Sequence, residues 1–559
     1  MIITLLPDNR TIDVPGGTTV SQLHALAGLP ACPAPICARV NNKFEDLSFS
    51  LFCPKQVEYI TPSSPEGMRC CVRSLCLMLY RAVTKLYPGA RLRVRNSISH
   101  GYYCTIAFPD GAPRLPRPEV AAAVRAEMQE LVARDLPIVR SELPTPQVAG
   151  MLRAQGLDEK ARLIEDLSEL YTVVYTLDTT TDTCIGPLAP STGMLGVFDF
   201  IPWGDGYGYL LVPPSKDNPL VPAVPVEQPK LARAFAEYQR FNRIVGISGA
   251  ADVHSMVRAK QAAMMVNIAE ALSAKHIRAI ADAITARFRE GQAKIVLIAG
   301  PSSSGKTTFT KRLAIELLTN LIRPVMISLD DYFVDRHLTP VDEDGEYDYE
   351  SIDAIDLRLF NAHLLDLTQG KEVNLPTYNF ETGTRQYQKD KVISLPKDSI
   401  LLIEGIHGLN PSLTERIPEK LKYRVYVSAL TTIAVDEHNW IPTTDTRLIR
   451  RIVRDCKYRG TSPLDTIRRW PSVRRGEEKW IFPYQENADS MFNSSLLFEL
   501  SVMRDEAERV LRTVPRTLPE YALARRLRLF LSYFPSIPTH LIPPTSLLRE
   551  FLGGSTLKY

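Results

Sequence analysis

Hydrophobic positions change their spacing several times along the chain, and these changes predict five successive stretches. Over residues 1–62, short apolar runs alternate with turns around one helical pattern from Ser21 to Ala27. Short strands grouped around a single helix are typical of a small β-grasp domain. Residues 63–225 combine helical patterns at Val72–Tyr87 and Pro118–Arg134 with strand-like runs, which predicts an α+β domain. The run TPSSPEG between them is interpreted as a linker.

The second half of the chain has a different pattern. Residues 226–290 show helical spacing and predict a helical connector, whereas residues 291–500 alternate apolar runs with helical segments. The runs KIVLIAG, PVMISL, SILLIEG and YRVYVS are continuously apolar, as expected for strands of a parallel sheet that is covered on both faces. Residues 501–559 are expected to form a C-terminal helical extension. The predicted fold class is therefore α/β, with two smaller domains in front of the parallel sheet.

Composition narrows the class of protein. The chain has 559 residues, 45% of them hydrophobic and 23% charged, which fits a folded protein of several domains. A net charge of +3 argues against a surface that is basic throughout. No apolar run reaches the length of a membrane span and the start lacks a signal pattern, so a cytoplasmic location without membrane contact is expected. The nine cysteines form no CxxC pair, and Cys32 and Cys37 are too loosely spaced for a zinc knuckle.

The segment AKIVLIAGPSSSGKTTF carries the strongest chemical signal. Gly300 and Gly305 bracket four residues and are followed by Lys306 and Thr307, which is the complete G-x-x-x-x-G-K-[ST] pattern between a strand and a helix. Backbone N–H groups of such a loop bind phosphate oxygens, Lys306 reaches the outer phosphates, and Thr307 binds the accompanying Mg²⁺. The expected ATP-binding residues of this loop are Gly300, Pro301, Ser302, Ser303, Ser304, Gly305, Lys306, Thr307 and Thr308. A chance glycine-rich turn is the alternative.

Two acidic residues follow apolar strands further along. Asp330 comes directly after PVMISL, and Glu404 directly follows the predicted strand Ser399–Ile403. Carboxylates at the C-terminal ends of parallel strands face the crevice where ligands bind. Asp330 is expected to accept a hydroxyl proton or to help hold Mg²⁺, and Glu404 is expected on the Mg²⁺ side. A loop or helix-capping aspartate and a solvated strand end are the alternatives.

Arginines then recur with helical spacing. Arg447, Arg450, Arg451 and Arg454 stand three or four residues apart, and Arg459-Gly460 is expected to end their helix. Guanidinium groups on one helix face can offset the charge that develops on a transferring phosphate. A solvated basic helix face is the alternative.

Taken in order, the motifs GPSSSGKTT, SLDDYF, GEYDYESIDAID, LPTYNF, LLIEGIHGL and DTRLIRRIVRD resemble the uridine kinase and phosphoribulokinase family of P-loop kinases. The resemblance covers about two hundred residues. It implies an ATP-dependent nucleoside kinase in which Asp330 is the catalytic base, with Lys306, Arg451 and Arg454 as further catalytic residues. It implies that Thr307, Asp330 and Glu404 surround Mg²⁺, the required cofactor.

The same resemblance implies an acceptor site and a lid. Asp348 would bind the sugar hydroxyls and Tyr378 would lie beside the base, with Arg451 and Arg454 on the acceptor side. Arg459 would belong to the lid over ATP. Gly383 stands where nucleoside-specific members carry a histidine, and a second lid arginine is missing, so phosphotransfer is better supported than uridine as the acceptor.

The front of the chain resembles two other domains. Residues 1–62 look like a TGS domain, and RSLCLMLYRAVTKLYPGARL with DTCIGPLAPSTG looks like the editing domain of threonyl-tRNA synthetases. That editing domain uses three histidines and a cysteine, whereas this chain has Arg73, Leu77, Cys184 and Leu188 at those positions. A lone thiol cannot build such a site, so no editing activity is expected. The combination resembles a bacterial multidomain nucleoside kinase group.

Three functions stay open at this stage. The first is a kinase that acts on ATP and a nucleoside-like small molecule. The second is an ATP-binding regulatory protein whose front domains dock on tRNA or the ribosome and bind RNA, while its ATPase acts as a switch. The third is a kinase for another hydroxyl acceptor, such as a sugar phosphate. The sequence leaves the oligomeric state open, including a homo-oligomer.

Overall fold

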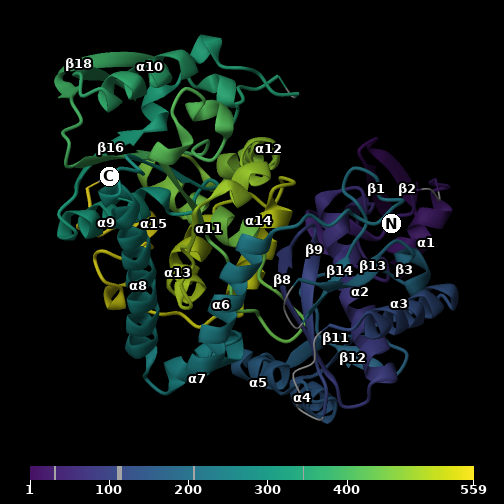
Figure 1. The fold of residues 1–559 in the computed structure, drawn as a ribbon. Coiled ribbons are helices and arrows are strands. Elements are labelled where there is room, and N and C mark those ends of the chain that lie inside the picture. Colours follow the sequence, from purple (N-terminus) through teal and green to yellow (C-terminus); the bar gives the residue numbers. More distant parts are fainter. Residues whose placement is uncertain (31–32, 110–115, 205–207, 344, 380, 559) are drawn as a thin grey trace. The chain divides into compact units, whose positions relative to one another are not determined.

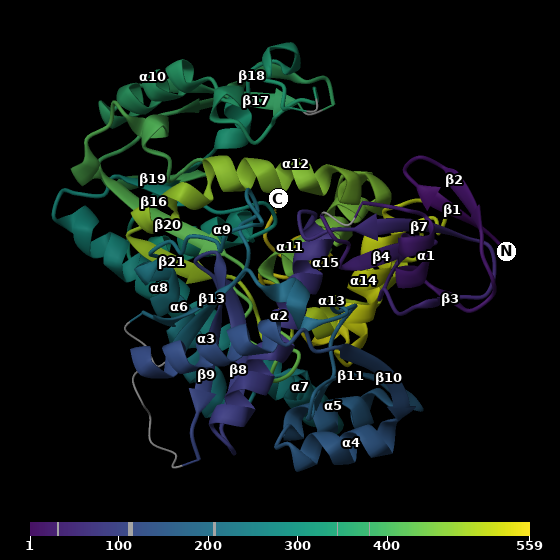
Figure 2. The ribbon, with the colours of Figure 1, turned by 90° about the vertical axis from the view of Figure 1, so that its right-hand side faces the viewer.

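The structure is a computed structural model that describes residues 1–559 except 31–32, 110–115, 205–207, 344, 380 and 559. The side chains of residues 389–390 are also outside the description. Cys32 and Phe380, which belong to two of the patterns above, lie outside the described residues. The chain divides into two compact units. The first comprises Met1–Lys260, Thr431–Pro442 and Arg504–Ser536, and the second comprises Gln261–Leu430, Thr443–Met503 and Ile537–Tyr559. Each unit is drawn in Figures 1 and 2.

The first unit begins with a five-stranded sheet of order β2-β1-β7-β4-β5. Its strands are β1 (Ile2–Leu6), β2 (Arg10–Asp13), β4 (Cys37–Val40), β5 (Lys43–Glu45) and β7 (Lys55–Ile60). Helix α1 (Val20–Leu26) begins at Thr19, which forms a capping box with Gln22. Val20 and Leu23 of this helix are buried against Ile3, Leu5 and Val57 of the sheet. This is the arrangement expected for residues 1–62.

A four-stranded antiparallel sheet of order β13-β14-β9-β8 follows in the same unit. It contains β8 (Arg91–Ile98), β9 (Gly101–Ala107), β13 (Asp199–Trp203) and β14 (Gly208–Val212). Leu92, Val94 and Cys104 of this sheet join a core with α2 (Pro65–Leu86) and α3 (Pro118–Ala133). Strands β10 (Ile138–Pro144), β11 (Tyr171–Leu177) and β12 (Thr180–Asp182) and helices α4 (Thr145–Ala154) and α5 (Asp158–Leu167) extend it.

Helix α2 begins before the expected Val72. Ser64 accepts a hydrogen bond from the backbone N–H of Gly67, and Pro65 occupies the first helical turn. Serine as N-cap followed by proline is a strong helix-start signal, so the end of TPSSPEG is helical rather than a linker. The expected helix Pro118–Arg134 is observed as α3, which ends one residue earlier.

The second unit contains a five-stranded parallel sheet of order β16-β19-β15-β20-β21. Its strands are β15 (Ile295–Ala299), β16 (Arg323–Ser328), β19 (Ser399–Glu404), β20 (Lys422–Ser428) and β21 (Ser490–Asn493). The four apolar runs predicted as strands are β15, β16, β19 and β20. The α/β fold class with a parallel sheet is therefore confirmed.

Both faces of this parallel sheet are covered, which explains why its strands are continuously apolar. Val296 and Ile298 of β15 pack against α8 (Ala262–Arg289) and α9 (Lys306–Thr319), whereas Ile295 and Leu297 face α10 (Leu357–Thr368). Figure 2 shows α10 beside the hairpin of β17 (Val373–Asn379) and β18 (Thr384–Ile393). The unit also contains α11 (Thr443–Tyr458), α12 (Pro463–Trp480) and the short α15 (Arg549–Leu552).

The units do not coincide with the five predicted stretches. The connector 226–290 holds α6 (Pro229–Val245), α7 (Ala250–Arg258) and α8, and the boundary between units falls inside it, after Lys260. Residues 501–559 are likewise shared between both units, because α13 (Glu499–Leu511) and α14 (Tyr521–Ser532) precede the return to the second unit at Ile537. The five boundaries stay predictions. Among the described helices, none has the length and apolar character needed to cross a bilayer.

Candidate active site

The phosphate loop connects β15, in the middle of the parallel sheet, to the start of α9. Gly300 lies so close to β20 that an added Cβ would stand 1.9 Å from the carbonyl oxygen of Val427. Gly305, at the N-cap of α9, has φ +86°. The first glycine is therefore required by close packing and the second by a left-handed backbone. Both glycines of the motif have a physical reason for being there.

Lys306 and Thr307 point into the site from the first turn of α9. The Lys306 Nζ donates to the carbonyl oxygens of Gly300 and Pro301, at 2.9 and 3.2 Å, so it curls back over the loop. The Thr307 hydroxyl donates to Oε1 of Glu404 at 3.1 Å. This bond joins the loop to the end of β19, the neighbouring strand.

Asp330 and Glu404 form an acidic pair at the C-terminal ends of β16 and β19. Burial raises the pKa of Glu404 to about 7, and the negative charge of Asp330 adds to this increase. Burial also raises the pKa of Asp330, while the positive charges of Lys306, Arg459 and Arg454 oppose the increase. Burial lowers the pKa of Lys306, and Glu404 and Asp330 oppose that change. These shifts indicate that the loop lysine and both predicted carboxylates interact electrostatically.

The predicted magnesium ligands fit that ion chemically. Thr307 and Glu404 are hydrogen-bonded, and Asp330 raises the pKa of Glu404 by like-charge repulsion, which a divalent cation would offset. Mg²⁺ prefers hard oxygen ligands and is usually held by one or two carboxylates together with substrate phosphates. Within the described residues, no three His, Cys, Asp or Glu side chains gather into a metal site. Thr307, Asp330 and Glu404 are thus compatible with Mg²⁺ that arrives with ATP.

The four arginines of α11 divide into two pairs. Arg447 and Arg450 are 1% and 0% exposed and form buried ion pairs with Glu477 and Glu499, respectively. Arg447 also donates to the carbonyl oxygen of Ser302 at 3.0 Å, and Arg450 donates to that of Ser303 at 3.3 Å. These two guanidinium groups therefore hold the backbone of the phosphate loop in place through its carbonyl oxygens. The expectation of one basic face over the phosphate does not hold for Arg447 and Arg450.

Arg451 and Arg454 lie toward the nucleotide site, as their neighbours indicate. Arg451 donates to the hydroxyl of Ser302 at 2.8 Å, and the Arg454 charge acts on Asp330. Both pair with Asp455, at 3.3 and 2.8 Å. Arg459, just beyond the helix end, stands 3.6 Å from the same carboxylate. Asp455 thus groups the three arginines that the sequence assigned to phosphate and lid.

The structure does not bring the two predicted acceptor residues together in any described contact. Asp348 is half-buried, and its carboxylate accepts the backbone N–H of Glu350 at 3.0 Å. Tyr378 is 6% exposed and packs against Phe333, with ring centroids 5.5 Å apart. Its backbone N–H donates to Asp331 at 3.3 Å. In this structure Tyr378 supports the end of β16, and its role beside a base stays a prediction.

Three glutamates near the loop were missed by the sequence analysis. Burial raises the pKa of Glu350 to about 7, opposed by Arg451 and Lys306. Glu477 accepts the backbone N–H of Ser302 at 3.1 Å, and Glu550 accepts that of Thr308 at 3.2 Å. The last two come from α12 and α15, far along the chain, and no local motif marks them. Only the acid spacing of GEYDYESIDAID could have drawn attention to Glu350.

The first unit contains the four positions that differ from the editing motif. Leu77 and Leu188 are each 1% exposed and belong to one hydrophobic core, against which Cys184 packs. Arg73 donates to the carbonyl oxygen of Pro187 at 2.9 Å. Burial raises the pKa of the Cys184 thiol, which keeps it protonated. Apolar packing and a guanidinium contact fill these positions, and the absence of editing activity stays a prediction.

A buried polar network lies beside this core. Lys160 forms an ion pair with Asp182, which also accepts a hydrogen bond from His438 at 2.6 Å. Asp436 stands 3.4 Å from the Lys160 ammonium. Burial would raise the pKa of Asp182, but Lys160 and His438 hold it at about 2. Segment Thr431–Pro442, which supplies His438 and Asp436, is therefore a structural part of the first unit although β20 and α11 of the second unit flank it in sequence.

Comparisons with known proteins match two separate parts of the chain. Residues 295–497 match the model of the Phosphoribulokinase / Uridine kinase family. The N-terminal region matches threonine–tRNA ligases, with 30% identity over 202 residues for Pelobacter propionicus and 29% over 203 residues for Symbiobacterium thermophilum. Each alignment covers 36% of this chain and 31% of the ligase, so the chain spans about a third of the length of these curated relatives. Both expected resemblances are confirmed.

A solved structure described as a possible uridine kinase from Bacillus stearothermophilus is also similar. It is 17% identical to this chain, with a TM-score of 0.25, and the similarity covers 36% of this chain and 89% of that one.

Proposed function

We propose that the chain is an ATP-dependent kinase that transfers the γ-phosphate of ATP to a sugar hydroxyl of a nucleoside-like acceptor. The observation that carries the proposal is the environment of Asp330. This carboxylate follows β16, and its pKa is influenced by the positive charges of Lys306 in the phosphate loop and of Arg454 and Arg459 at and just beyond the end of α11. A proton acceptor that faces phosphate-binding cations is what hydroxyl phosphorylation requires. The family match over residues 295–497 supports the same chemistry.

In the proposed reaction, Asp330 accepts the proton of the acceptor hydroxyl. The hydroxyl oxygen forms a bond to the γ-phosphorus while the bond from that phosphorus to the β,γ-bridging oxygen breaks, and ADP leaves with the electron pair. Lys306 exchanges its bonds to the Gly300 and Pro301 carbonyls for phosphate oxygens. Arg451 and Arg454 offset the charge that spreads over the transferring group. Mg²⁺ held by Thr307, Asp330 and Glu404 would neutralise phosphate charge.

The test is product formation. The full chain is incubated with ATP, Mg²⁺ and each of several nucleosides, and the products are followed by mass spectrometry. The proposal expects a gain of one phosphate on at least one nucleoside. ATP hydrolysis that does not depend on any acceptor would contradict it. Sugar phosphates belong in the same panel, because Gly383 replaces the histidine that reads a pyrimidine in nucleoside-specific members.

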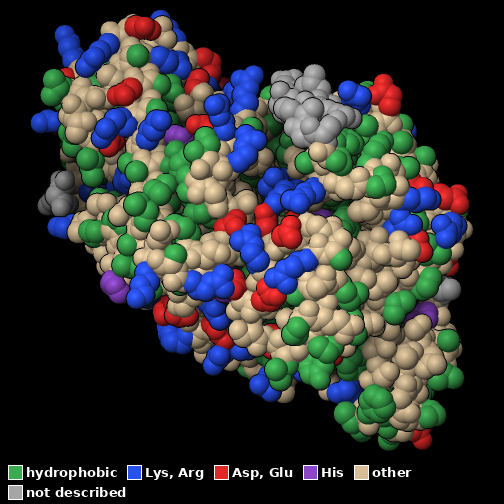
Figure 3. Space-filling model, turned by 90° about the horizontal axis from the view of Figure 1, so that it is seen from below, with side chains coloured by type: hydrophobic (Ala, Val, Ile, Leu, Met, Phe, Trp, Pro, Cys, Tyr) green, Lys and Arg blue, Asp and Glu red, His purple; other side chains and the backbone are tan. Residues whose placement is uncertain are grey.

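A second candidate function is favoured by the ligase match at the N-terminal region. The front domains could dock on tRNA while the ATP site acts as a switch. On the face seen in Figure 3, Lys and Arg side chains are interspersed with Asp and Glu rather than joined into one basic surface. Retention on tRNA that falls steeply with salt would favour this function, since phosphate contacts release counterions.

A further inference from the structure

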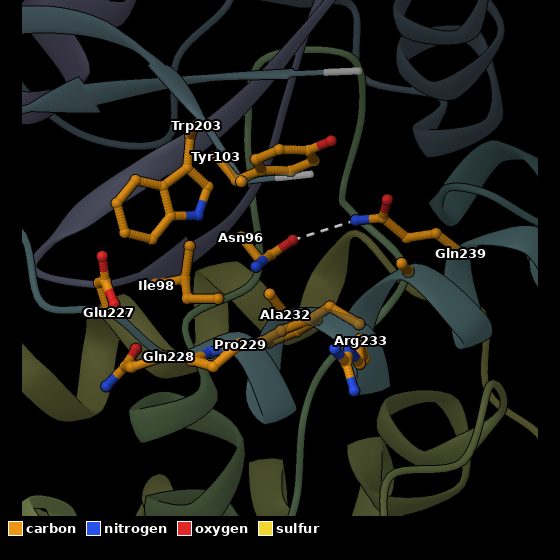
Figure 4. Close-up of a pocket in the computed structure, with 13 residues that line it drawn as sticks. Asn96, Ile98, Tyr103, Trp203, Glu227, Gln228, Pro229, Ala232, Arg233 and Gln239 are labelled. Carbon is orange, nitrogen blue, oxygen red and sulfur yellow. Dashed lines mark hydrogen bonds between the residues drawn. The ribbon is translucent and has the colours of Figure 1, made fainter. Parts of the chain in front are cut away.

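A cavity of about 490 Å³ lies within the first unit, between the four-stranded sheet and α6. This volume is within the range of sites for small ligands. Asn96 and Ile98 of β8, Tyr103 of β9 and Trp203 of β13 line the sheet side. The helix side is lined by Glu227, Gln228, Pro229, Ala232, Arg233, Phe235, Ala236 and Gln239. Figure 4 shows the indole of Trp203 and the amide of Asn96 directed toward the space above Pro229 and Ala232. None of these residues belongs to the kinase site or to the editing-like positions.

A β-bulge creates the polar wall of this cavity. Val94 pairs with Cys104 and both face the core under α2, but the register then shifts, so that Asn96 pairs with Tyr103. Because the extra residue on β8 reverses which of its side chains face each side, Asn96 faces α6 instead of the core, beside Tyr103, which faces α6 by ordinary alternation with Cys104. Bulges of this kind re-aim side chains next to binding sites. The sheet therefore presents the amide of Asn96 opposite Tyr103, where an unbroken register would have placed Arg95.

The polar groups of the cavity are arranged as a donor and acceptor pair. Asn96 is 4% exposed, and its Oδ1 accepts a hydrogen bond from Nε2 of Gln239 at 3.1 Å. That bond holds both amides in place and leaves the Asn96 amide nitrogen and the Gln239 carbonyl oxygen to face a ligand. The Trp203 Nε1 is buried and, among the described residues, has no hydrogen-bond partner. A buried N–H without an acceptor costs free energy, which a bound acceptor would recover.

The charge and shape of the lining define the ligand class. Glu227 and Arg233 contribute one negative and one positive charge, so the lining as a whole is neutral. Trp203 and Tyr103 offer flat aromatic surfaces, on which planar heterocycles stack. Asn and Gln side chains recognise nucleobases through adjacent donor and acceptor atoms on the base edge. We propose that this cavity binds a nucleobase or nucleoside, with the base packed against Trp203 and its edge bonded to Asn96 and Gln239. The proposal is independent of the kinase reaction.

Binding of adenosine, guanosine, cytidine and uridine to the full chain, measured by equilibrium dialysis up to about 1 mM, tests the proposal. Three variants separate this cavity from any acceptor site in the second unit. Trp203→Leu removes the stacking surface, Ala232→Phe fills the cavity from a half-exposed helix position, and Tyr171→Leu is a control at an aromatic residue that is 59% exposed. Circular dichroism confirms that each variant is folded.

At least one nucleoside is expected to bind with a component that weakens about tenfold or more in both Trp203→Leu and Ala232→Phe. That component should be retained in Tyr171→Leu and in Asp330→Asn, because neither change touches the cavity. If Trp203→Leu fails to fold, Ala232→Phe decides alone. Absence of binding by all four nucleosides, or binding of equal strength in wild type and Ala232→Phe, would overturn the proposal.

Discussion

Glu550 and Thr308 stand 242 positions apart in the sequence, yet the Glu550 carboxylate accepts hydrogen bonds from the Thr308 backbone N–H and hydroxyl, at 3.2 and 2.7 Å. Thr308 lies in the first turn of α9, where free N–H groups and the helix dipole attract phosphate. Phe551, the next residue, packs under Arg450, with the guanidinium carbon 5.1 Å from the ring centroid. The C-terminal segment thus places a negative charge at the start of the phosphate-loop helix.

The first prediction follows from that charge. Glu550→Gln should lower the KM for ATP about two- to fivefold with little change in kcat, because an anion at a helix N-terminus competes electrostatically with phosphate by about 0.3–1 kcal/mol. Steady-state kinetics at low ionic strength measure the effect. Glu415→Gln, at an exposed position of the same unit, is the matched control. A higher KM in Glu550→Gln would mean instead that Glu550 supports the loop.

The second prediction concerns Asp330. Asp330→Asn should reduce kcat by about 100-fold or more while the Kd for ATP changes little, because an amide cannot accept the hydroxyl proton. Asp331→Asn is the neighbouring control, since the Asp331 carboxylate accepts the backbone N–H of Tyr378 at 3.3 Å. Turnover and nucleotide binding are measured on both proteins. If the Asp331 variant were the one that lost turnover, the assignment of the base would be wrong.

A third prediction concerns pH. The folded-state pKa of Glu404 is raised from 4.5 to about 7, so the native protein binds this proton more tightly than the unfolded chain does. The contribution to stability is therefore full below pH 4.5 and is lost as the pH rises toward 7. Without nucleotide, stability should fall over this window, by at most about 3 kcal/mol from this group.

Glu404→Gln tests that linkage, because it removes the titrating group and keeps its shape. The variant should gain thermal stability relative to wild type at pH 8 but not at pH 5, as measured by the unfolding temperature. Glu415→Gln again serves as the control. Parallel pH profiles for wild type and Glu404→Gln would show that Glu404 does not titrate in this range.

The features that the sequence located in the fold are those whose signal is local. Strand β15 (Ile295–Ala299) lies within the predicted run KIVLIAG, because five apolar residues before a glycine-rich loop leave little choice of structure. Asp330 comes just after β16 and Glu404 is the last residue of β19. These strands are parallel and adjacent, so their C-terminal ends lie at one edge. Tertiary structure, by contrast, brought Glu477 and Glu550 to the loop, and no spacing rule connects residues so distant.

Helix boundaries show the same difference. Ser64-Pro65 is a start signal that the sequence does contain, but the turn-like composition of TPSSPEG predicts a linker at the same place.

The bulge that turns Asn96 toward α6 leaves no trace in the alternation of β8, because Leu92, Val94, Asn96 and Ile98 all occupy even positions. A shift of pairing register is a property of two strands together, and a single strand sequence does not encode it visibly.

The arginines of α11 provide the last prediction, because identical side chains on one helix have different environments. Arg450 is 0% exposed and pairs with Glu499, which is 1% exposed, whereas Arg454 keeps 12% of its side chain exposed beside Asp455. Arg450→Met should lower stability by about 3–5 kcal/mol, since it leaves a buried carboxylate without its partner. Arg454→Ala should lower kcat and leave the unfolding temperature nearly unchanged.

Thermal unfolding and turnover, measured on both variants, separate the two roles. Arg450→Met is then combined with Glu499→Leu, because an apolar pair of similar volume removes the unpaired charge and should restore much of the stability. Restored folding with restored turnover would show that Arg450 acts through stability alone and that its hydrogen bond to the Ser303 carbonyl is dispensable for turnover. A stable Arg450→Met protein without activity would instead place this guanidinium among the catalytic groups, and the division of α11 into two pairs would then be wrong.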